Sequence, residues 1–128
     1  GYECRHNLAY WTGKDYIGIG CAAHSLQNGI RSRRSSNLTE YMTHPDPCES
    51  IALTKKDRYE EFIMLRLRLT EGFSFRQCAS DTGTDIRRTR SSELEALQRG
   101  GYIIINGDNC RLSDKGMDLC DAVTLQLI

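Results

Sequence analysis

Residues 58–69 read RYEEFIMLRLRL, a pattern that predicts a helix with apolar side chains on most of its circumference. Those side chains are Phe62, Ile63, Met64, Leu65, Leu67 and Leu69. Thr54 and Asp57 have the spacing of a capping motif before the helix, and Gly72 is expected to end it. Because a helix that is apolar all round must be buried, we expect this helix at the centre of its domain.

Two shorter helices are predicted to follow the central one. Ser74 and Gln77 form a capping box that opens the first of them, which is expected to end near Gly83. The second lies between residues 85 and 99, with a start as late as Ser92.

A β-hairpin and a last helix complete this part of the chain. Residues 102–112, YIIINGDNCRL, predict a hairpin that turns at Asn106-Gly107 or one residue beyond. Ser113 is the predicted N-cap of the last helix, whose inner stripe comprises Met117, Cys120, Val123 and Leu127. The order helix, helix, helix, hairpin, helix is typical of a winged-helix-like domain, with the short third helix in the recognition position.

The first part of the chain has glycines and short apolar runs instead. Residues 16–20, YIGIG, predict a short buried strand in which Gly18 and Gly20 allow close backbone approach. Asn28-Gly29 is a strong hairpin signal, and Asn37 is the predicted N-cap of a short helix.

These elements place the chain in the α+β class, with a boundary near residue 50. The boundary follows the loop-like stretch THPDPCES at 43–50, which contains both prolines. We expect a connecting segment of strand, hairpin and short helix at 1–50, and a mainly helical, winged-helix-like domain at 51–128.

The composition limits the partners. Seventeen basic residues balance seventeen acidic ones, so the net charge gives no overall attraction to nucleic acid or to an anionic membrane. No apolar run approaches the roughly 18–20 residues that span a bilayer. The 128-residue chain opens abruptly, without Met or a signal peptide, and we expect it to be a piece of a longer protein.

The six cysteines are widely and irregularly spaced and form no C-x-x-C pair. Zinc and iron–sulfur sites favour tight local spacing, so no metal site is expected in this chain. We predict six unlinked thiols that fill small apolar gaps, as is typical of a cytoplasmic protein.

A nucleic-acid site is the alternative that the winged-helix order raises. Arg87, Arg88 and Arg90 lie on or just before the third helix, where arginines can contact phosphates or guanine edges. Acidic residues flank them and the net charge is zero, which favours a solvated face. A second basic cluster, RSRR at 31–34, belongs to the other part of the chain.

Residues 4–11, CRHNLAYW, gather a histidine, an amide, a tyrosine and the chain's one tryptophan. Such a set suits either a site for a planar ligand or a packed polar edge of the fold. The other histidines are His24 and His44, and no serine–histidine–acid or cysteine–histidine arrangement can be identified.

Several stretches resemble one family. GYECRHNLAYW, then YIGIGCAAHS and NGIR, resemble the segment directly after the barrel in the oxygen-independent coproporphyrinogen III oxidase family of radical S-adenosylmethionine proteins. EEFIMLRLRLTEGFS and LSDKGMDLCDAV are similar to the C-terminal domain of that family. The match covers nearly the whole chain in the right order.

The H-N-x-x-Y-W pattern of His6, Asn7, Tyr10 and Trp11 resembles the haem chaperone branch of the family, in which it is associated with haem binding. The resemblance implies that Tyr10 and Trp11 contact a porphyrin or haem, that His6 ligates iron, and that Asn7 orients a neighbour. His24 is a secondary candidate. The alternative is that the aromatic pair only attaches the domain to the barrel.

The resemblance also implies what the rest of the protein holds. The family's C-x-x-x-C-x-x-C motif is absent here, so the [4Fe–4S] cluster, the S-adenosylmethionine site and the barrel are expected upstream of residue 1. This chain would cover the barrel, help to bind porphyrin or haem, and catalyse nothing alone. The parent would be an oxidoreductase of the coproporphyrinogen dehydrogenase type or a haem chaperone; a protein-interaction module is a further alternative.

Two departures from the family pattern affect the structure. Cys21 and Ala22 stand where Pro and Gly are usual, and Ala22 predicts a backbone without positive φ. Arg66 stands where the family tends to have a glycine within the central helix.

Overall fold

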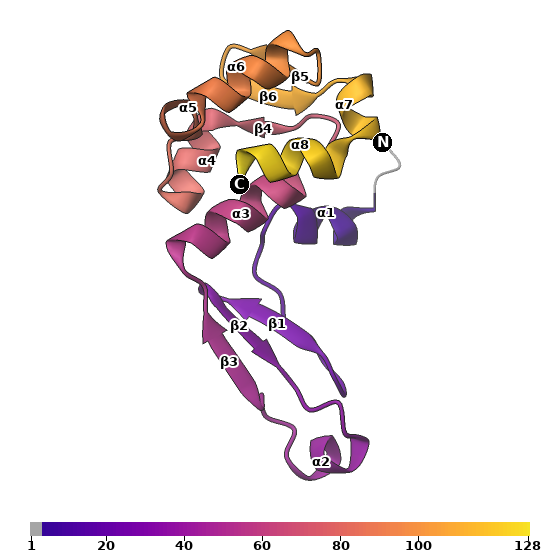
Figure 1. Ribbon diagram of the computed structural model, residues 1–128. Coiled ribbons are helices and arrows are strands. Elements are labelled where there is room, and N and C mark those ends of the chain that lie inside the picture. The colour runs from indigo at the N-terminus through magenta and orange to yellow at the C-terminus, as the bar shows by residue number, and fades with distance from the viewer. Residues whose placement is uncertain (1–3) are drawn as a thin grey trace. The chain divides into compact units, whose positions relative to one another are not determined.

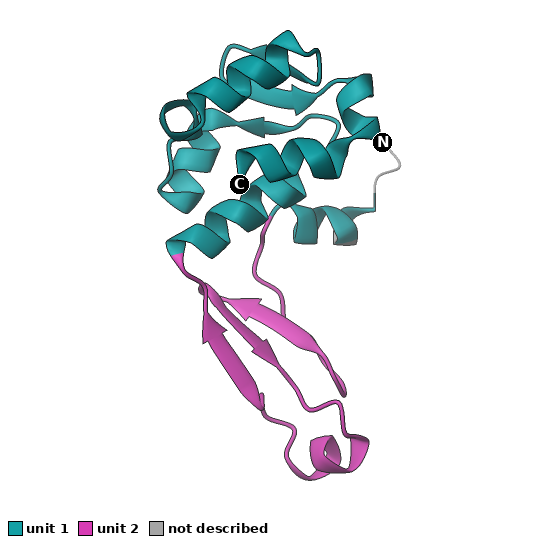
Figure 2. Ribbon diagram, viewed as in Figure 1, with its two compact units in different colours: residues 1–12, 55–128 teal, residues 13–54 magenta. Residues whose placement is uncertain are grey.

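The computed structural model describes residues 4–128, and for His6 it describes the backbone only. The chain forms two compact units, one of residues 13–54 and the other of Gly1–Thr12 together with Lys55–Ile128 (Figure 2). Helices and strands are mixed along the chain (Figure 1), which confirms the α+β class. The boundary between Thr54 and Lys55 lies close to the predicted division near residue 50. Residues 1–12, however, group with the C-terminal unit.

The unit of residues 13–54 is built on an antiparallel sheet with the strand order β1 (His24–Gln27), β2 (Ile30–Arg33) and β3 (Glu49–Ala52). Asn28 and Gly29 connect β1 to β2 with φ angles of 50° and 74°, as a tight two-residue hairpin requires. Asn37 caps α2 (Leu38–Thr43), accepting hydrogen bonds from two main-chain N–H groups. Both of these predictions are confirmed.

Residues 16–20 do not form the predicted buried strand. Tyr16 makes a single bridge to Leu26 of β1, and the side chains of Ile17 and Ile19 are 62% and 87% exposed. The stretch stays unburied because no apolar layer of its own unit covers it. Gly18 does make the close approach that its position predicted, since a Cβ atom there would lie 2.2 Å from the main-chain oxygen of His24.

Two further details of this unit differ from the sequence prediction. Ala22 has a φ of +61°, so the expectation of an ordinary backbone there is wrong. Its N–H donates to the main-chain oxygen of Ser35 at 2.8 Å, a bond that helps to hold the unfavourable conformation. Residues 49–52 form β3 because they pair with β2, although the first two of them were expected to belong to the loop at 43–50.

The helices of the other unit are α1 (Arg5–Trp11), α3 (Lys55–Arg66), α4 (Phe75–Thr82), α5 (Ile86–Thr89), α6 (Ser91–Arg99), α7 (Asp114–Asp118) and α8 (Cys120–Leu127). The central helix α3 ends at Arg66, earlier than the predicted Gly72. Gly72 lies instead against β6, where a Cβ atom would come within 2.0 Å of the main-chain oxygen of Cys110. The caps at Ser74 and Ser113 are present as predicted.

A three-stranded antiparallel sheet completes this unit, in the order β4 (Phe73–Ser74), β6 (Asn109–Leu112) and β5 (Ile103–Asn106). The hairpin turns at residues 107–108, one residue beyond Asn106-Gly107, as the pattern allowed. The two-residue strand β4 was not predicted. The order of the three predicted helices, the hairpin and the last helix is present, while its classification as winged-helix-like stays a prediction.

Two of the predicted helices are broken. The third divides at Arg90 into α5 and α6, and the last divides at Leu119 into α7 and α8. The break at Leu119 changes which side chains face inward, because the two helical pieces no longer share one stripe. Val123 and Leu127 are buried as predicted, whereas Met117 is 39% exposed, so its assignment to the inner stripe is wrong.

The apolar core belongs to this larger unit, where α8 packs against both α3 and α6. Its fully buried side chains include Ile63, Leu67, Ile86 and Leu127. In the unit of residues 13–54, by contrast, no described apolar side chain is buried. No described helix has both the length and the apolar character needed to cross a membrane.

Candidate functional site

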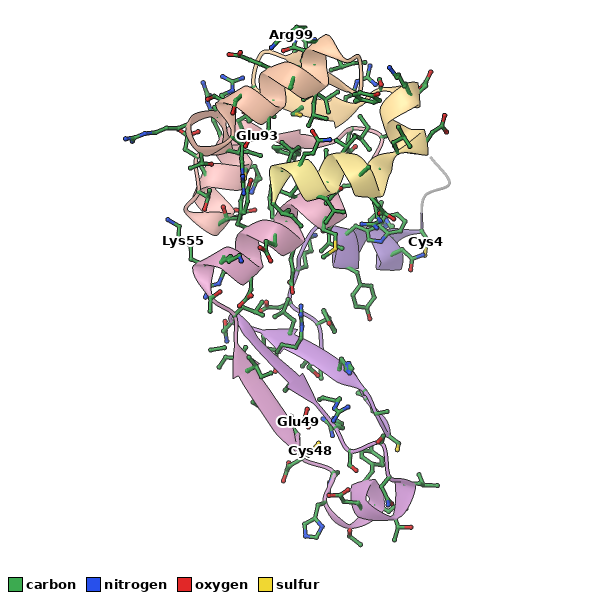
Figure 3. All side chains as sticks on the ribbon, in the orientation of Figure 1. Cys4, Cys48, Glu49, Lys55, Glu93 and Arg99 are labelled. Carbon is green, nitrogen blue, oxygen red and sulfur yellow. The ribbon has the colours of Figure 1, made fainter. Side chains whose placement is uncertain are left out.

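The predicted ligand residues lie on α1, a helix that the sequence pattern did not indicate. The helix begins after Cys4 (Figure 3), and the φ and ψ angles of Cys4 are those of extended backbone. At its other end the hydroxyl of Thr12 donates to the main-chain oxygen of Leu8 at 2.8 Å. Gly13 follows with a φ of +68°, a conformation that commonly ends helices.

The two sides of α1 differ in exposure. At 3.6 residues per turn, Leu8, Ala9 and Thr12 share one side, and all three are half-buried. The opposite side carries positions 6, 7, 10 and 11. Asn7 is exposed, and Tyr10 and Trp11 are each 39% exposed.

His6 lies on this opposite side by its backbone position, although its side chain is outside the described residues. The fold thus brings all four positions of the H-N-x-x-Y-W pattern to one side of one helix. We call His6, Asn7, Tyr10 and Trp11 the α1 outer face. His24, the secondary candidate, is an exposed residue of β1 in the other unit.

Arg66 connects α1 to the central helix. Its guanidinium Nη2 donates to the main-chain oxygen of Thr12 at 3.3 Å, and its guanidinium carbon lies 5.4 Å from the ring centre of Phe62. The sequence showed Arg66 only as a departure from a family glycine. The available signal was that Arg66 and Arg68 interrupt the apolar stretch of residues 62–69, and neither arginine's long-range partner could be inferred from it.

Two of the three arginines of the nucleic-acid alternative make contacts within the fold. The guanidinium of Arg87 lies 4.1 Å from the ring centre of Phe75 and donates to the main-chain oxygen of Gly107. Arg90 donates to the main-chain oxygen of Ile128 at 2.6 Å and pairs with Glu93 of α6 at 3.5 Å. Arg88 is exposed on α5. The three therefore do not act together as a free basic surface.

The tip of the β5–β6 hairpin is attached to the start of α4. The main-chain oxygen of Asp108 accepts a hydrogen bond from Phe75 N at 2.8 Å, and its carboxylate accepts bonds from the Ser74 hydroxyl and from Arg76 N. Because the tip is held from several sides, it is not the free wing that would reach a nucleic-acid groove.

The basic cluster at 31–34 is also engaged within its own unit. Arg33 pairs with Glu49 at 2.9 Å, and the guanidinium of Arg34 donates to the main-chain oxygen of Pro45. These two guanidinium groups hold the connection between β2 and β3.

Three buried titratable groups have raised pKa values. Burial raises the pKa of the Tyr59 hydroxyl to about 12, that of the Cys78 thiol to about 11 and that of the Cys110 thiol to about 12. All three groups are therefore protonated near neutral pH. All six cysteines carry free thiols. Among the described residues, no three His, Cys, Asp or Glu side chains are grouped to hold a metal ion.

Comparison with known proteins confirms the predicted resemblance. A family model described as the HemN C-terminal domain matches residues 53–119. The "Heme chaperone HemW" of Haemophilus influenzae is 31% identical over 121 residues, which is 91% of this chain and 31% of that protein. The protein of the same name from Escherichia coli is 31% identical over 123 residues, or 91% of this chain and 32% of the relative.

The fold is also found in a solved structure. "Coproporphyrinogen III oxidase (HemN) from Escherichia coli", described as a radical SAM enzyme, matches with a TM-score of 0.67 at 15% identity, over 89% of this chain and 28% of that one. This chain spans about a third of the length of the curated relatives that it matches. The matched residues and the identities show that the chain belongs to the HemN C-terminal domain family.

Proposed function

We propose that this chain is the C-terminal part of a longer radical S-adenosylmethionine protein of porphyrin and haem metabolism, and that its α1 outer face forms one wall of a porphyrin or haem site. The observation that carries this proposal is the presence of His6, Asn7, Tyr10 and Trp11 on one side of one helix. The names of the relatives, which are heme chaperones, favour haem as the ligand.

Each residue of the α1 outer face has a chemical role in this proposal. Tyr10 and Trp11 supply flat apolar surface to the macrocycle, which their partial exposure leaves accessible. His6 supplies an imidazole nitrogen for iron, and Asn7 supplies an amide that orients a neighbouring group. A helix face contacts a macrocycle from one side, so the opposite wall would come from the barrel.

We assign the barrel of the same protein as the partner that covers the unit of residues 13–54. Ile17, Ile19, Ile51, Leu38 and Met42 of that unit are between 62% and 87% exposed. Exposed apolar side chains at this density mark an interaction surface. The relatives continue for about two thirds of their length beyond the part matched here, which provides chain for such a barrel.

The [4Fe–4S] cluster and S-adenosylmethionine would be held by the barrel. In this proposal the barrel also carries out the radical chemistry. We place the protein in the cytoplasm, a reducing compartment in which six free thiols are stable.

Haem titration of the longer parent and of this chain, followed by the Soret band, tests the proposal. His6→Ala should weaken or shift the Soret band, because it removes an iron ligand. Trp11→Ala should lower the affinity and leave the band position unchanged, because it removes only apolar contact. This chain alone should bind haem more weakly than the parent.

His24→Ala is the control, since His24 lies in the other unit and should leave both affinity and spectrum unchanged. If His24→Ala abolishes binding while His6→Ala has no effect, the ligand is assigned to the wrong residue. If neither substitution changes binding, the α1 outer face is a packing surface.

A further inference from the structure

Arg66 occupies a defined place at the end of the central helix. It is the last residue of α3 and its side chain is half-buried. The guanidinium lies 5.4 Å from the ring centre of Phe62, which is itself only 9% exposed. Packing on a buried ring restricts the orientation of the planar guanidinium, so its N–H groups point in a fixed direction.

The hydrogen bond from Arg66 reaches the C-terminal end of α1. Its acceptor is the main-chain oxygen of Thr12, the residue that caps α1. The last carbonyl groups of a helix lack partners within the helix, and they carry the negative end of its dipole. A cation bound there satisfies one of these groups and stabilises the helix end.

α1 depends on such contacts. It has seven residues, and isolated helices shorter than roughly 12–15 residues are marginal in water. Its inward side offers only the half-buried Leu8, Ala9 and Thr12, without a fully buried apolar side chain. The charged hydrogen bond at Thr12 is therefore one of the contacts that hold it in place.

We infer that Arg66 is the positioning residue of the α1 outer face: by binding the Thr12 carbonyl, it fixes the end of the helix that presents Tyr10 and Trp11. The identity of the ligand, porphyrin or haem, rests on the proposed function. The structural step, in which Arg66 fixes the end of α1, does not. Arg66 acts through Thr12, and it needs no contact with the porphyrin or haem. Because Trp11 directly precedes Thr12, loss of the Arg66–Thr12 hydrogen bond should mobilise the Trp11 ring before the rest of the helix.

The structural step can be measured without any ligand, because Trp11 is the one tryptophan of the chain. In the 128-residue protein, Arg66→Ala should increase the segmental motion of Trp11 in time-resolved fluorescence anisotropy and increase its quenching by acrylamide. Arg66→Lys keeps a cation and a donor, and it should restore part of the difference.

Arg68→Ala is the matched control. Arg68 follows two residues later, and its guanidinium is directed to other partners: it pairs with Asp121 at 2.9 Å and donates to the main-chain oxygen of Met64. Its loss should leave the motion of Trp11 unchanged. Far-UV circular dichroism establishes that each variant is folded, and Arg66→Lys decides the question if Arg66→Ala does not fold.

The functional step is measured by haem titration of the same proteins. Arg66→Ala should weaken haem binding by about fivefold with the Soret position unchanged, as expected for loss of a half-exposed charged hydrogen bond away from the iron. Arg68→Ala should bind haem as the unsubstituted protein does.

The two measurements separate the possible failures. Unchanged motion of Trp11 in Arg66→Ala overturns the inference, whatever the haem titration gives. Increased motion with unchanged haem affinity shows that Arg66 holds α1 without positioning a ligand face, which also overturns it. If neither the unsubstituted chain nor the longer parent binds haem, the proposed function fails, and the anisotropy alone then decides whether Arg66 fixes α1.

Discussion

The guanidinium carbon of Arg87 lies 4.1 Å from the ring centre of Phe75, and the same group binds the main-chain oxygen of Gly107 at the hairpin tip. Arg87 thus joins α5, the start of α4 and the hairpin. The nucleic-acid alternative treats Arg87 as a phosphate contact, but its guanidinium is part of the packing of this unit.

Arg87→Ala should therefore lower the free energy of unfolding by about 1 kcal/mol, through loss of the cation–π contact and of one hydrogen bond. Arg88→Ala, at the adjacent exposed position, should change it by less than about 0.5 kcal/mol. Urea denaturation of the two variants measures the difference. Equal effects would contradict the structural role of Arg87.

Gly116→Ala should be strongly destabilising. Gly116 is in α7, and a Cβ atom there would lie 1.9 Å from the main-chain oxygen of Tyr102, so backbone must move to admit it. We expect a loss of about 2–3 kcal/mol, as for an overpacked core site. Gly101→Ala is the comparison. Gly101 has a φ of +73° and a Cβ atom there would have no atom within 4 Å, so the substitution should cost only about 1 kcal/mol of stability, through backbone strain.

Stability should fall on the alkaline side. Burial raises the pKa of Cys110 from 9.0 to about 12 and that of Tyr59 from 10.0 to about 12. Between these values the unfolded chain has released protons that the folded chain still holds, so rising pH favours unfolding. The stabilisation is complete below pH 9 and is lost as pH rises towards 12.

Urea midpoints measured between pH 8 and about 11 should thus stay constant up to about pH 9 and decrease above it. Cys110→Ala should reduce the slope, whereas Cys48→Ala, at an exposed position, should leave it unchanged. A midpoint that stays constant over this range would show that the two groups are not buried as described.

Hydrogen exchange should be faster in the unit of residues 13–54 than in α3. None of the described apolar side chains of that unit is buried, while α3 contributes Ile63 and Phe62 to the core of the other unit. Local opening should consequently need less free energy in the former. Equal protection, measured by mass spectrometry, would be evidence that residues 13–54 are stable without a covering partner.

The features that could be predicted from sequence are those set by a few neighbouring residues. The caps at Asn37, Ser74 and Ser113 follow from side chains that bind main-chain groups two or three residues away. The Asn28-Gly29 turn likewise depends only on residues that tolerate positive φ. Local chemistry is sufficient for each of them.

The features that sequence reasoning missed depend on distant contacts. The third helix breaks at Arg90, whose guanidinium binds Ile128 from the far end of the chain. β4 is a two-residue strand that exists because β6 lies beside it. α1 was missed because part of its support, Arg66, lies 54 positions beyond Thr12; the four residues of the α1 outer face stay a prediction.

The division of the larger unit into two pieces of chain has a consequence for folding kinetics. α1 and α3 belong to one unit, but about forty residues separate them in the sequence. Closing a loop of this length in the unfolded chain opposes docking by about 3 kcal/mol of entropy, whereas the α3–α4 and hairpin contacts close short loops. Contacts of low sequence separation form early, so the core around α3 should assemble first and α1 should dock onto it last.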